Sequence, residues 1–142
     1  MVELFVYSRS AIASVRPHDA PHVIISITSH ESDVASLRTN ASCAGVLRLS
    51  FVDAETPSDQ YAEDALFSPN HATKIWDFVY DHRPRIERIL AHCDAGVSRS
   101  AAVAAAIARV FNGDDAEFSS GRYRPNPRVY RMLLAAHARR GV

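Results

Sequence analysis

The segment His92-Cys93-Asp94-Ala95-Gly96-Val97-Ser98-Arg99-Ser100 determines how the rest of the chain is interpreted. It places a cysteine and an arginine at the two ends of a five-residue loop. The apolar run Ile89-Leu90-Ala91 before it is typical of a buried strand, and the alanine-rich run 101–110 after it is typical of a helix. The loop is therefore expected to lead into a helix N-terminus.

A loop in this position is suited to binding an anion. Unpaired amides and aligned peptide dipoles at a helix N-terminus attract negative charge, and Gly96 lets the backbone curl without a Cβ clash. The same field favours the thiolate form of Cys93 over the thiol. Arg99 can hold two oxygens of a phosphoryl group with its planar guanidinium, and Ser100 can donate a hydrogen bond to the sulfur. The segment therefore predicts phosphate chemistry.

The segment resembles the His-Cys-X5-Arg-Ser/Thr signature of the cysteine-dependent protein tyrosine and dual-specificity phosphatases, in a small, bacterial-type form. The resemblance implies a phosphocysteine mechanism in which Cys93 is the nucleophile and Arg99 stabilises the transition state. It also implies that His92 orients the surroundings of the cysteine without transferring protons. The phosphate-binding residues that it implies are Asp94, Ala95, Gly96, Val97, Ser98 and Arg99.

Such a mechanism needs a group that protonates the leaving oxygen and later activates water. In the resembling phosphatases this group is an aspartate on a mobile loop a few dozen residues before the cysteine. Asp53 follows the end of a predicted strand and is the expected acid, although its separation of 40 residues from Cys93 suggests an insertion. The alternatives in the same acidic loop are Glu55, Asp59, Glu63 and Asp64.

The alternation of apolar β-branched runs with helical patterns predicts one α/β domain over residues 1–142, with a central open sheet flanked by helices in the three layers of the phosphatase fold. Strands are expected at 4–7, 23–28, 46–51 and 86–91, and a long surface loop at 52–68. Helices are expected at 10–15, 33–38, 69–83, 101–110 and 127–138. In the 69–83 helix, Ile75, Phe78 and Val79 should form the buried face, with Trp76 flanking it.

Composition restricts the partners and the compartment. The net charge is +0 and the pI is about 7.1, so we expect no nucleic-acid and no membrane partner. The N-terminus lacks the features of a signal peptide, and two cysteines do not make a disulfide framework, which favours the cytoplasm. Cys43 is expected in the core, with a redox partnership with Cys93 as the alternative. The histidines show no ligand spacing, so neither a metal nor another cofactor is expected.

The loop also bears on the substrate. Relatives that prefer inositol phosphates carry lysines in this loop, whereas Asp94 would repel a polyanion. We therefore expect a phosphorylated protein as substrate, mainly at phosphotyrosine, with phosphoserine, phosphothreonine and small phosphoesters as alternatives. The segment Arg122-Tyr123-Arg124 and the following Asn126-Pro127-Arg128 either flank the pocket or form a solvated face. A phosphate-binding module without turnover and a sulfur- or arsenic-handling enzyme are the other function classes considered, and the sequence predicts no oligomeric state.

Overall fold

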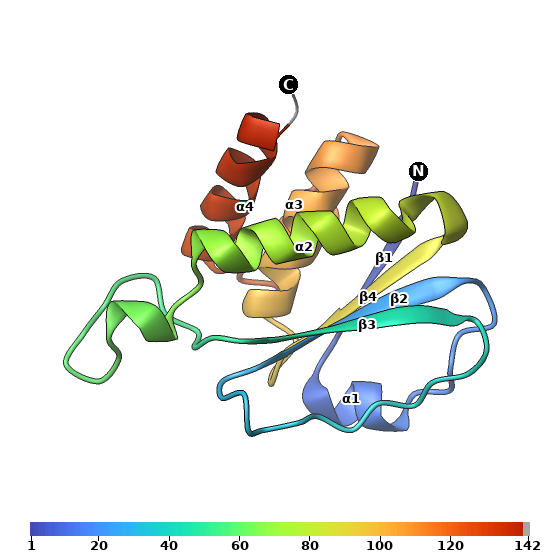
Figure 1. Cartoon of the computed structure of the whole chain (residues 1–142), viewed down its shortest axis with the longest axis horizontal. Helices are drawn as coiled ribbons and strands as arrows, with labels where there is room; N and C mark the ends of the chain where they lie inside the picture. Colours follow the sequence, from blue (N-terminus) through green and yellow to red (C-terminus); the bar gives the residue numbers. More distant parts are fainter. Residues whose placement is uncertain (141–142) are drawn as a thin grey trace.

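The computed structural model describes residues 1–140 and contains one sheet of four parallel strands. The strands are β1 (Glu3–Tyr7), β2 (His22–Thr28), β3 (Cys43–Ser50) and β4 (Arg88–His92), and they lie in the order β1-β4-β2-β3 (Figure 1). Because all strands run in the same direction, their carboxyl ends meet at one edge of the sheet. In open α/β sheets this edge is where ligands bind.

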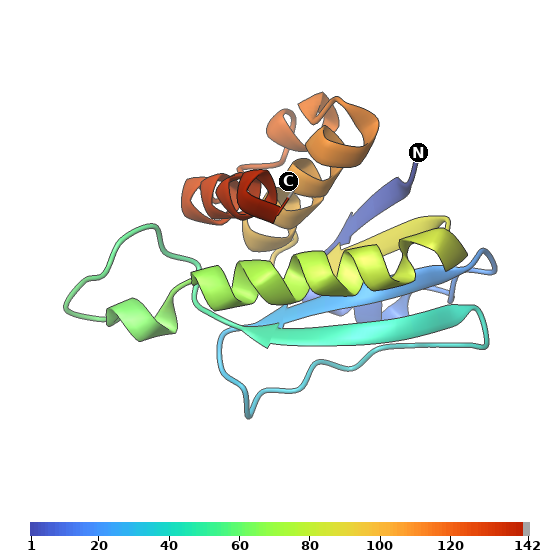
Figure 2. The same ribbon diagram turned by 45° about the horizontal axis from the view of Figure 1, so that its top comes forward.

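Helices cover both faces of the sheet. The helices α2 (Pro69–His82), α3 (Arg99–Asn112) and α4 (Pro127–Arg140) lie on one face, while α1 (Arg9–Ser14) lies on the other face with the irregular segment 29–42 (Figures 1 and 2). Three short 3-10 turns are η1 (Glu63–Ala65), η2 (Arg83–Arg85) and η3 (Ala116–Ser119). The three-layer α/β arrangement expected from the sequence is confirmed. No helix within residues 1–140 has both the length and the apolar character needed to cross a bilayer.

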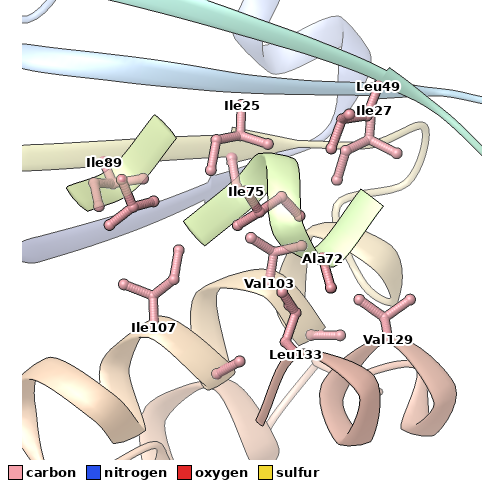
Figure 3. Packing of buried hydrophobic residues seen from close by; sticks show 14 of the residues in the cluster. Ile25, Ile27, Leu49, Ala72, Ile75, Ile89, Val103, Ile107, Val129 and Leu133 are labelled. Carbon is pink, nitrogen blue, oxygen red and sulfur yellow. The ribbon is translucent and has the colours of Figure 1, made fainter. Parts of the chain in front are cut away.

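The main hydrophobic core lies between the sheet and the three-helix face (Figure 3). Aliphatic side chains of the inner strands pack there against α2, α3 and α4, and a smaller cluster of Ile12, Ile24 and Leu90 lies under α1. Every residue of β2 is buried, as expected for a strand covered on both faces. The residues labelled in Figure 3 are Ile25, Ile27, Leu49, Ala72, Ile75, Ile89, Val103, Ile107, Val129 and Leu133.

Three expectations about α2 and its surroundings were wrong. Trp76 does not flank the buried face of α2: it is fully buried, because its indole Nε1–H donates to the carbonyl of Leu133 at 2.9 Å and α4 covers it. Phe78 is only partly buried. The strand expected at 86–91 begins at Arg88, because η2 carries the chain through Ile86.

The helix expected at 33–38 does not form. In this segment Val34 is 63% exposed and only Ala35 is buried, so no helical stripe of apolar side chains would face the core. Arginine side chains hold the segment in place instead. Arg9 pairs with the carboxylate of Asp33, and Arg48 donates to the carbonyl of Ala35 at 3.1 Å.

Helix ends follow the local sequence. Ser68 caps α2 by accepting from the N–H of His71, whose ring accepts in return from the Ser68 N–H, and Pro69 occupies the first helical position. Gly113 ends α3 in the left-handed conformation at φ 76°, which glycine adopts without strain. The observed α3 begins two residues before the expected one, so that Arg99 lies in its first turn.

The core predicts a contrast between two valines on neighbouring strands. Val23→Ala removes two buried methyl groups at a fully covered position and should lower the free energy of unfolding by about 2 kcal/mol. Val46→Ala makes the same chemical change on β3 at a position that is 37% exposed, and should cost about 0.5 kcal/mol. Urea unfolding of both variants measures the difference. Equal losses would contradict the packing described here.

Candidate active site

The cysteine loop (residues 93–98) connects the end of β4 to the start of α3. At its centre Gly96 has φ 71° and lies against the junction of β1 and α1. A Cβ at this position would come within 2.6 Å of the Ser8 nitrogen and 2.7 Å of the Tyr7 carbonyl carbon. Both the conformation and the close approach therefore require glycine here.

Neighbouring segments fix the orientation of the peptide groups of the loop. Three carbonyls accept backbone N–H bonds from outside it: Asp94 from Arg9 at 3.0 Å, Val97 from Arg124 at 2.8 Å and Ser98 from Asn126 at 3.1 Å. In a trans peptide the following N–H points opposite to the carbonyl. The amides of residues 95, 98 and 99 are therefore directed away from these neighbours, in the manner of an anion-binding turn.

The sulfur of Cys93 lies at the N-terminus of α3. The residue is buried, with 2% of its surface exposed, and its Sγ is 3.0 Å from the Ser100 Oγ and 3.5 Å from the Ser100 nitrogen that donates to it. Ser98, at the N-cap position, does not cap the helix with its side chain, because its hydroxyl donates to Asp53 at 2.8 Å. The first turn of α3 thus presents its donors to the sulfur.

His92 is a buried neutral imidazole. Its Nδ1 lies 3.2 Å from the carbonyl oxygen of Cys93, an atom that can only accept, so Nδ1 carries the proton. Its Nε2 then accepts from the hydroxyl of Ser26 at 2.6 Å. Burial lowers the pKa of His92, which keeps the ring neutral. The ring therefore links the backbone of Cys93 to Ser26 of β2.

The guanidinium of Arg99 is anchored at the carboxyl ends of β2 and β3. Its Nη1 donates to the carbonyl of Phe51 at 2.8 Å and to the Ser29 hydroxyl at 3.1 Å, and its Nη2 donates to Asp94 at 3.0 Å. The side chain is buried, and its Nε is the buried side-chain nitrogen within residues 1–140 that has no hydrogen-bond partner. A buried donor without an acceptor is costly, which is typical of a site that binds an anion.

Asp53 lies at the rim of the cysteine loop, three residues beyond β3. Its Oδ1 accepts from the Ser98 hydroxyl and from the side-chain amide of Asn126, both at 2.8 Å. Asn126 is buried, and its own side-chain oxygen accepts from the backbone N–H groups of Arg128 and Val129 at the start of α4. Sequence reasoning named Asn126 only as part of a segment that could flank the pocket, and it missed the bond to Asp53 because no local pattern links the two residues.

The other acidic residues of the 52–68 loop make no such contact. Glu63 pairs with Arg128 at 2.8 Å, Asp64 lines a separate cavity, and Glu55 and Asp59 are exposed. Cys43 begins β3, at the opposite edge of the sheet from Cys93, so a redox partnership between the two thiols is ruled out by the topology. Within residues 1–140 no group of three or more metal-ligating side chains is arranged to hold a metal ion.

Two cavities lie at the carboxyl edge of the sheet, and one of them includes a residue of the cysteine loop, Ser98. One of about 550 Å³ is lined by Asp53, Ser98, Tyr123, Arg124 and Asn126 among others, which places the basic segment beside the loop. The other, of about 440 Å³, lies toward β3 and includes Ser29, Arg48, His71 and Lys74. Neither cavity has Cys93 in its lining. The thiol is largely covered, in keeping with the 2% exposure of Cys93.

The buried histidines predict how stability depends on pH. Because the pKa of His92 lies below 6.5 in the folded protein, the unfolded chain binds the proton more readily as the pH falls through this value. Burial lowers the pKa in the same direction for His18, His71 and His137. The hydrogen bond from Arg9 lowers the pKa of Asp33 below 3.8, so this carboxylate stays charged and adds no slope near neutrality.

We therefore expect a lower melting temperature at pH 5.5 than at pH 7.5. Calorimetry at both values measures it, and a His92→Gln variant should show a shallower dependence than the original protein. A melting temperature that rises on acidification would contradict the assignment of neutral buried imidazoles.

Comparison with known proteins identifies the fold. No protein-family model matches the chain, and no curated protein is significantly similar to it. Among solved structures, the human tyrosine phosphatase-like serine/threonine/tyrosine-interacting protein is similar over 98% of this chain and 93% of its own, with 18% identity and a TM-score of 0.64. Human DUSP28 is similar over 99% and 98%, with 16% identity and a TM-score of 0.63.

A mouse putative dual specificity phosphatase, solved with zinc tungstate, is similar over 96% of this chain and 86% of its own, with 17% identity and a TM-score of 0.60. These similarities extend over nearly the whole chain, whereas the resemblance in sequence is specific only in the cysteine loop. The chain has the fold of the dual-specificity and tyrosine phosphatases.

Proposed function

We propose that this protein is a phosphatase that hydrolyses phosphomonoesters through a phosphocysteine formed on Cys93. The observation that carries the proposal is the convergence of three groups in one loop: a sulfur at the N-terminus of α3, inward-directed amides, and a buried guanidinium with an unpaired Nε. Such donors stabilise the charge that develops on a transferring phosphoryl group. The fold of the tyrosine and dual-specificity phosphatases supports the same conclusion.

In the first step the thiolate of Cys93 attacks phosphorus, the S–P bond forms and the ester P–O bond breaks. Asp53 gives its proton to the departing oxygen. Both hydrogen bonds that Asp53 receives end on Oδ1, so Oδ2 is the oxygen available to carry the proton. In the second step the Asp53 carboxylate takes a proton from water, the oxygen of that water attacks phosphorus, and the S–P bond breaks.

The sulfur leaves as a thiolate in the second step, and the Ser100 hydroxyl at 3.0 Å donates to it as the negative charge returns. Arg99 and the loop amides stabilise the equatorial oxygens in both steps. His92 takes no part in proton transfer, because its two nitrogens are committed to Ser26 and to the Cys93 carbonyl. Its role is to hold the backbone that carries the nucleophile.

A binding module that keeps the loop but does not turn over is the second candidate. One protein of similar structure is described as a phosphatase-like interacting protein, so the fold alone does not distinguish the two functions. The presence of Cys93, Arg99 and Ser100 together with a positioned Asp53 favours the enzyme. A reducing compartment such as the cytoplasm suits this assignment, since the nucleophile is a free thiol.

For the substrate we propose a phosphorylated protein, mainly at phosphotyrosine, with phosphoserine and phosphothreonine also accepted. DUSP28 and a mouse putative dual specificity phosphatase have a similar fold, and the open cavity that includes Asp53 and Ser98 leaves room for residues flanking a phosphorylated side chain. Rates on phosphotyrosine, phosphothreonine and small phosphoesters, compared at equal concentration, test this order.

The role of Cys93 predicts a separation of turnover from binding. Cys93→Ser should abolish hydrolysis of an aryl phosphate, because a serine hydroxyl is not ionised at neutral pH. Binding of vanadate or inorganic phosphate, followed by calorimetry, should persist because the amides and Arg99 remain. Residual hydrolysis above a few per cent of the original rate would remove Cys93 from the role of nucleophile.

The role of Asp53 predicts a dependence on the leaving group. Asp53→Asn should lower kcat by about 10²-fold on an alkyl phosphate, a poor leaving group, and much less on an activated aryl phosphate. Glu55→Gln is the matched control, since Glu55 lines the same cavity and does not contact the loop side chains. If Glu55→Gln shows the larger loss, the general acid has been assigned to the wrong residue.

A further inference from the structure

Asp94 stands at the mouth of the cysteine loop between two guanidinium groups. Its Oδ2 accepts from the Nη2 of Arg99 at 3.0 Å, and its Oδ1 lies 3.9 Å from the Nη1 of Arg9. The side chain of Asp94 is 52% exposed, whereas that of Arg99 is 5% exposed. A half-exposed carboxylate is therefore paired with a buried cation.

We propose, on the basis of the phosphatase function above, that Asp94 is a specificity-determining residue: its carboxylate competes with the substrate phosphate for Arg99 and transfers to Arg9 when phosphate binds. In the free enzyme the Asp94 carboxylate pairs with Arg99, and in the phosphate-bound enzyme it pairs with Arg9. Arg9 therefore acts as the alternative partner of this carboxylate.

The hydrogen bonds of Arg99 show why the two anions compete. Its Nη1 is committed to the Phe51 carbonyl and the Ser29 hydroxyl, which belong to the protein and stay in place. A bidentate pairing with phosphate uses two parallel N–H groups on one edge of a guanidinium. The remaining edge consists of Nε, which has no partner, and Nη2, which Asp94 holds. A phosphoryl group that binds this edge would share Nη2 with the Asp94 carboxylate, and the two negative charges would repel each other at this short distance.

Arg9 is prepared to receive the displaced carboxylate. Its guanidinium is fixed by two bonds to the carboxylate of Asp33, at 2.6 and 2.7 Å. Its backbone N–H donates to the carbonyl of Asp94 at 3.0 Å, which holds the main chain of Asp94 while the side chain rotates. Because Asp94 is half exposed, this rotation does not bury an unpaired charge.

The transfer has a consequence for selectivity. When phosphate occupies Arg99, the carboxylates of Asp33 and Asp94 both surround Arg9, so this side of the mouth carries one net negative charge. A second phosphate close to the first would meet this charge and be repelled. The site should therefore prefer an ester whose phosphate stands alone over compounds that carry phosphates on adjacent atoms.

The first test measures the inhibition constant of inorganic phosphate against hydrolysis of an aryl phosphate. Asp94→Asn should lower this constant by about tenfold, because the neutral amide competes less well than the carboxylate for Arg99. Asp94 is half exposed, so solvent screening keeps the effect from being larger. Glu31→Gln removes the same charge from an exposed residue in the neighbouring cavity and should change the constant by less than about twofold. An unchanged constant in Asp94→Asn, or an equal change in both variants, would overturn the proposal.

The second test addresses Arg9. Arg9→Gln should raise the inhibition constant several-fold in the original protein, because the displaced carboxylate has no second partner. In the Asp94→Asn background the same substitution should have a clearly smaller effect. Equal effects in both backgrounds would mean that Arg9 acts only as a nearby cation, and the transfer would be wrong.

The third test uses a six-carbon sugar alcohol bisphosphate with adjacent phosphates as a competitor, beside its monophosphate. Asp94→Asn should lower the inhibition constant of the bisphosphate more than that of the monophosphate, so that the ratio of the two constants falls by about threefold or more. High salt should make this difference between the original protein and the variant smaller. A ratio that does not change would refute the selectivity. If the original protein hydrolyses no aryl phosphate, the proposed function fails. Calorimetry of phosphate binding to the original protein and to Asp94→Asn then tests separately whether Asp94 competes with phosphate for Arg99.

Discussion

The close packing of Gly96 against the β1–α1 junction is the constraint on which the site depends. Because the loop has no side chain at this point, the backbone of Ser8 and Tyr7 can lie directly beside it. Backbone N–H groups of the neighbouring segments donate to three carbonyls of the loop. Because the next N–H in a trans peptide points opposite to the carbonyl, these bonds fix the direction of the loop amides. The shape of an anion site is thus set by main-chain contacts from distant parts of the chain, before any side chain contributes.

The parallel sheet brings the remaining groups to the same edge. Cys93 follows β4, Ser29 follows β2, and Phe51 and Asp53 follow β3, so three strands deliver their ends to one place. The guanidinium of Arg99 joins two of these ends by donating to Ser29 and Phe51. The arginine that we propose to bind phosphate is thereby held rigid by the fold, and this rigidity would lower the entropy lost on binding.

The sequence predicted the loop, the strands and most helices because these depend on local chemistry: apolar β-branched runs, alanine-rich helix formers, proline and glycine at the ends. It also predicted that Asp53 follows the end of a strand, which is confirmed, whereas the role of Asp53 as general acid stays a proposal. The role of Asn126, the burial of Trp76 and the absence of a helix at 33–38 depend on contacts between segments far apart in the chain. Local propensity does not predict such contacts, because α4 covers Trp76 and arginines from two other elements hold the 33–38 segment.

Asn126 connects the start of α4 to Asp53 in the 52–68 loop, two features that are far apart in the sequence. Its side-chain oxygen starts α4 by accepting from two backbone amides, and its side-chain nitrogen donates to Asp53. Fraying of the first turn of α4 would therefore remove one of the two hydrogen bonds that hold the Asp53 carboxylate and leave the one from Ser98. The stability of the helix end is thus linked to that of the 52–68 loop, although Asn126 and Asp53 lie 73 residues apart in the chain.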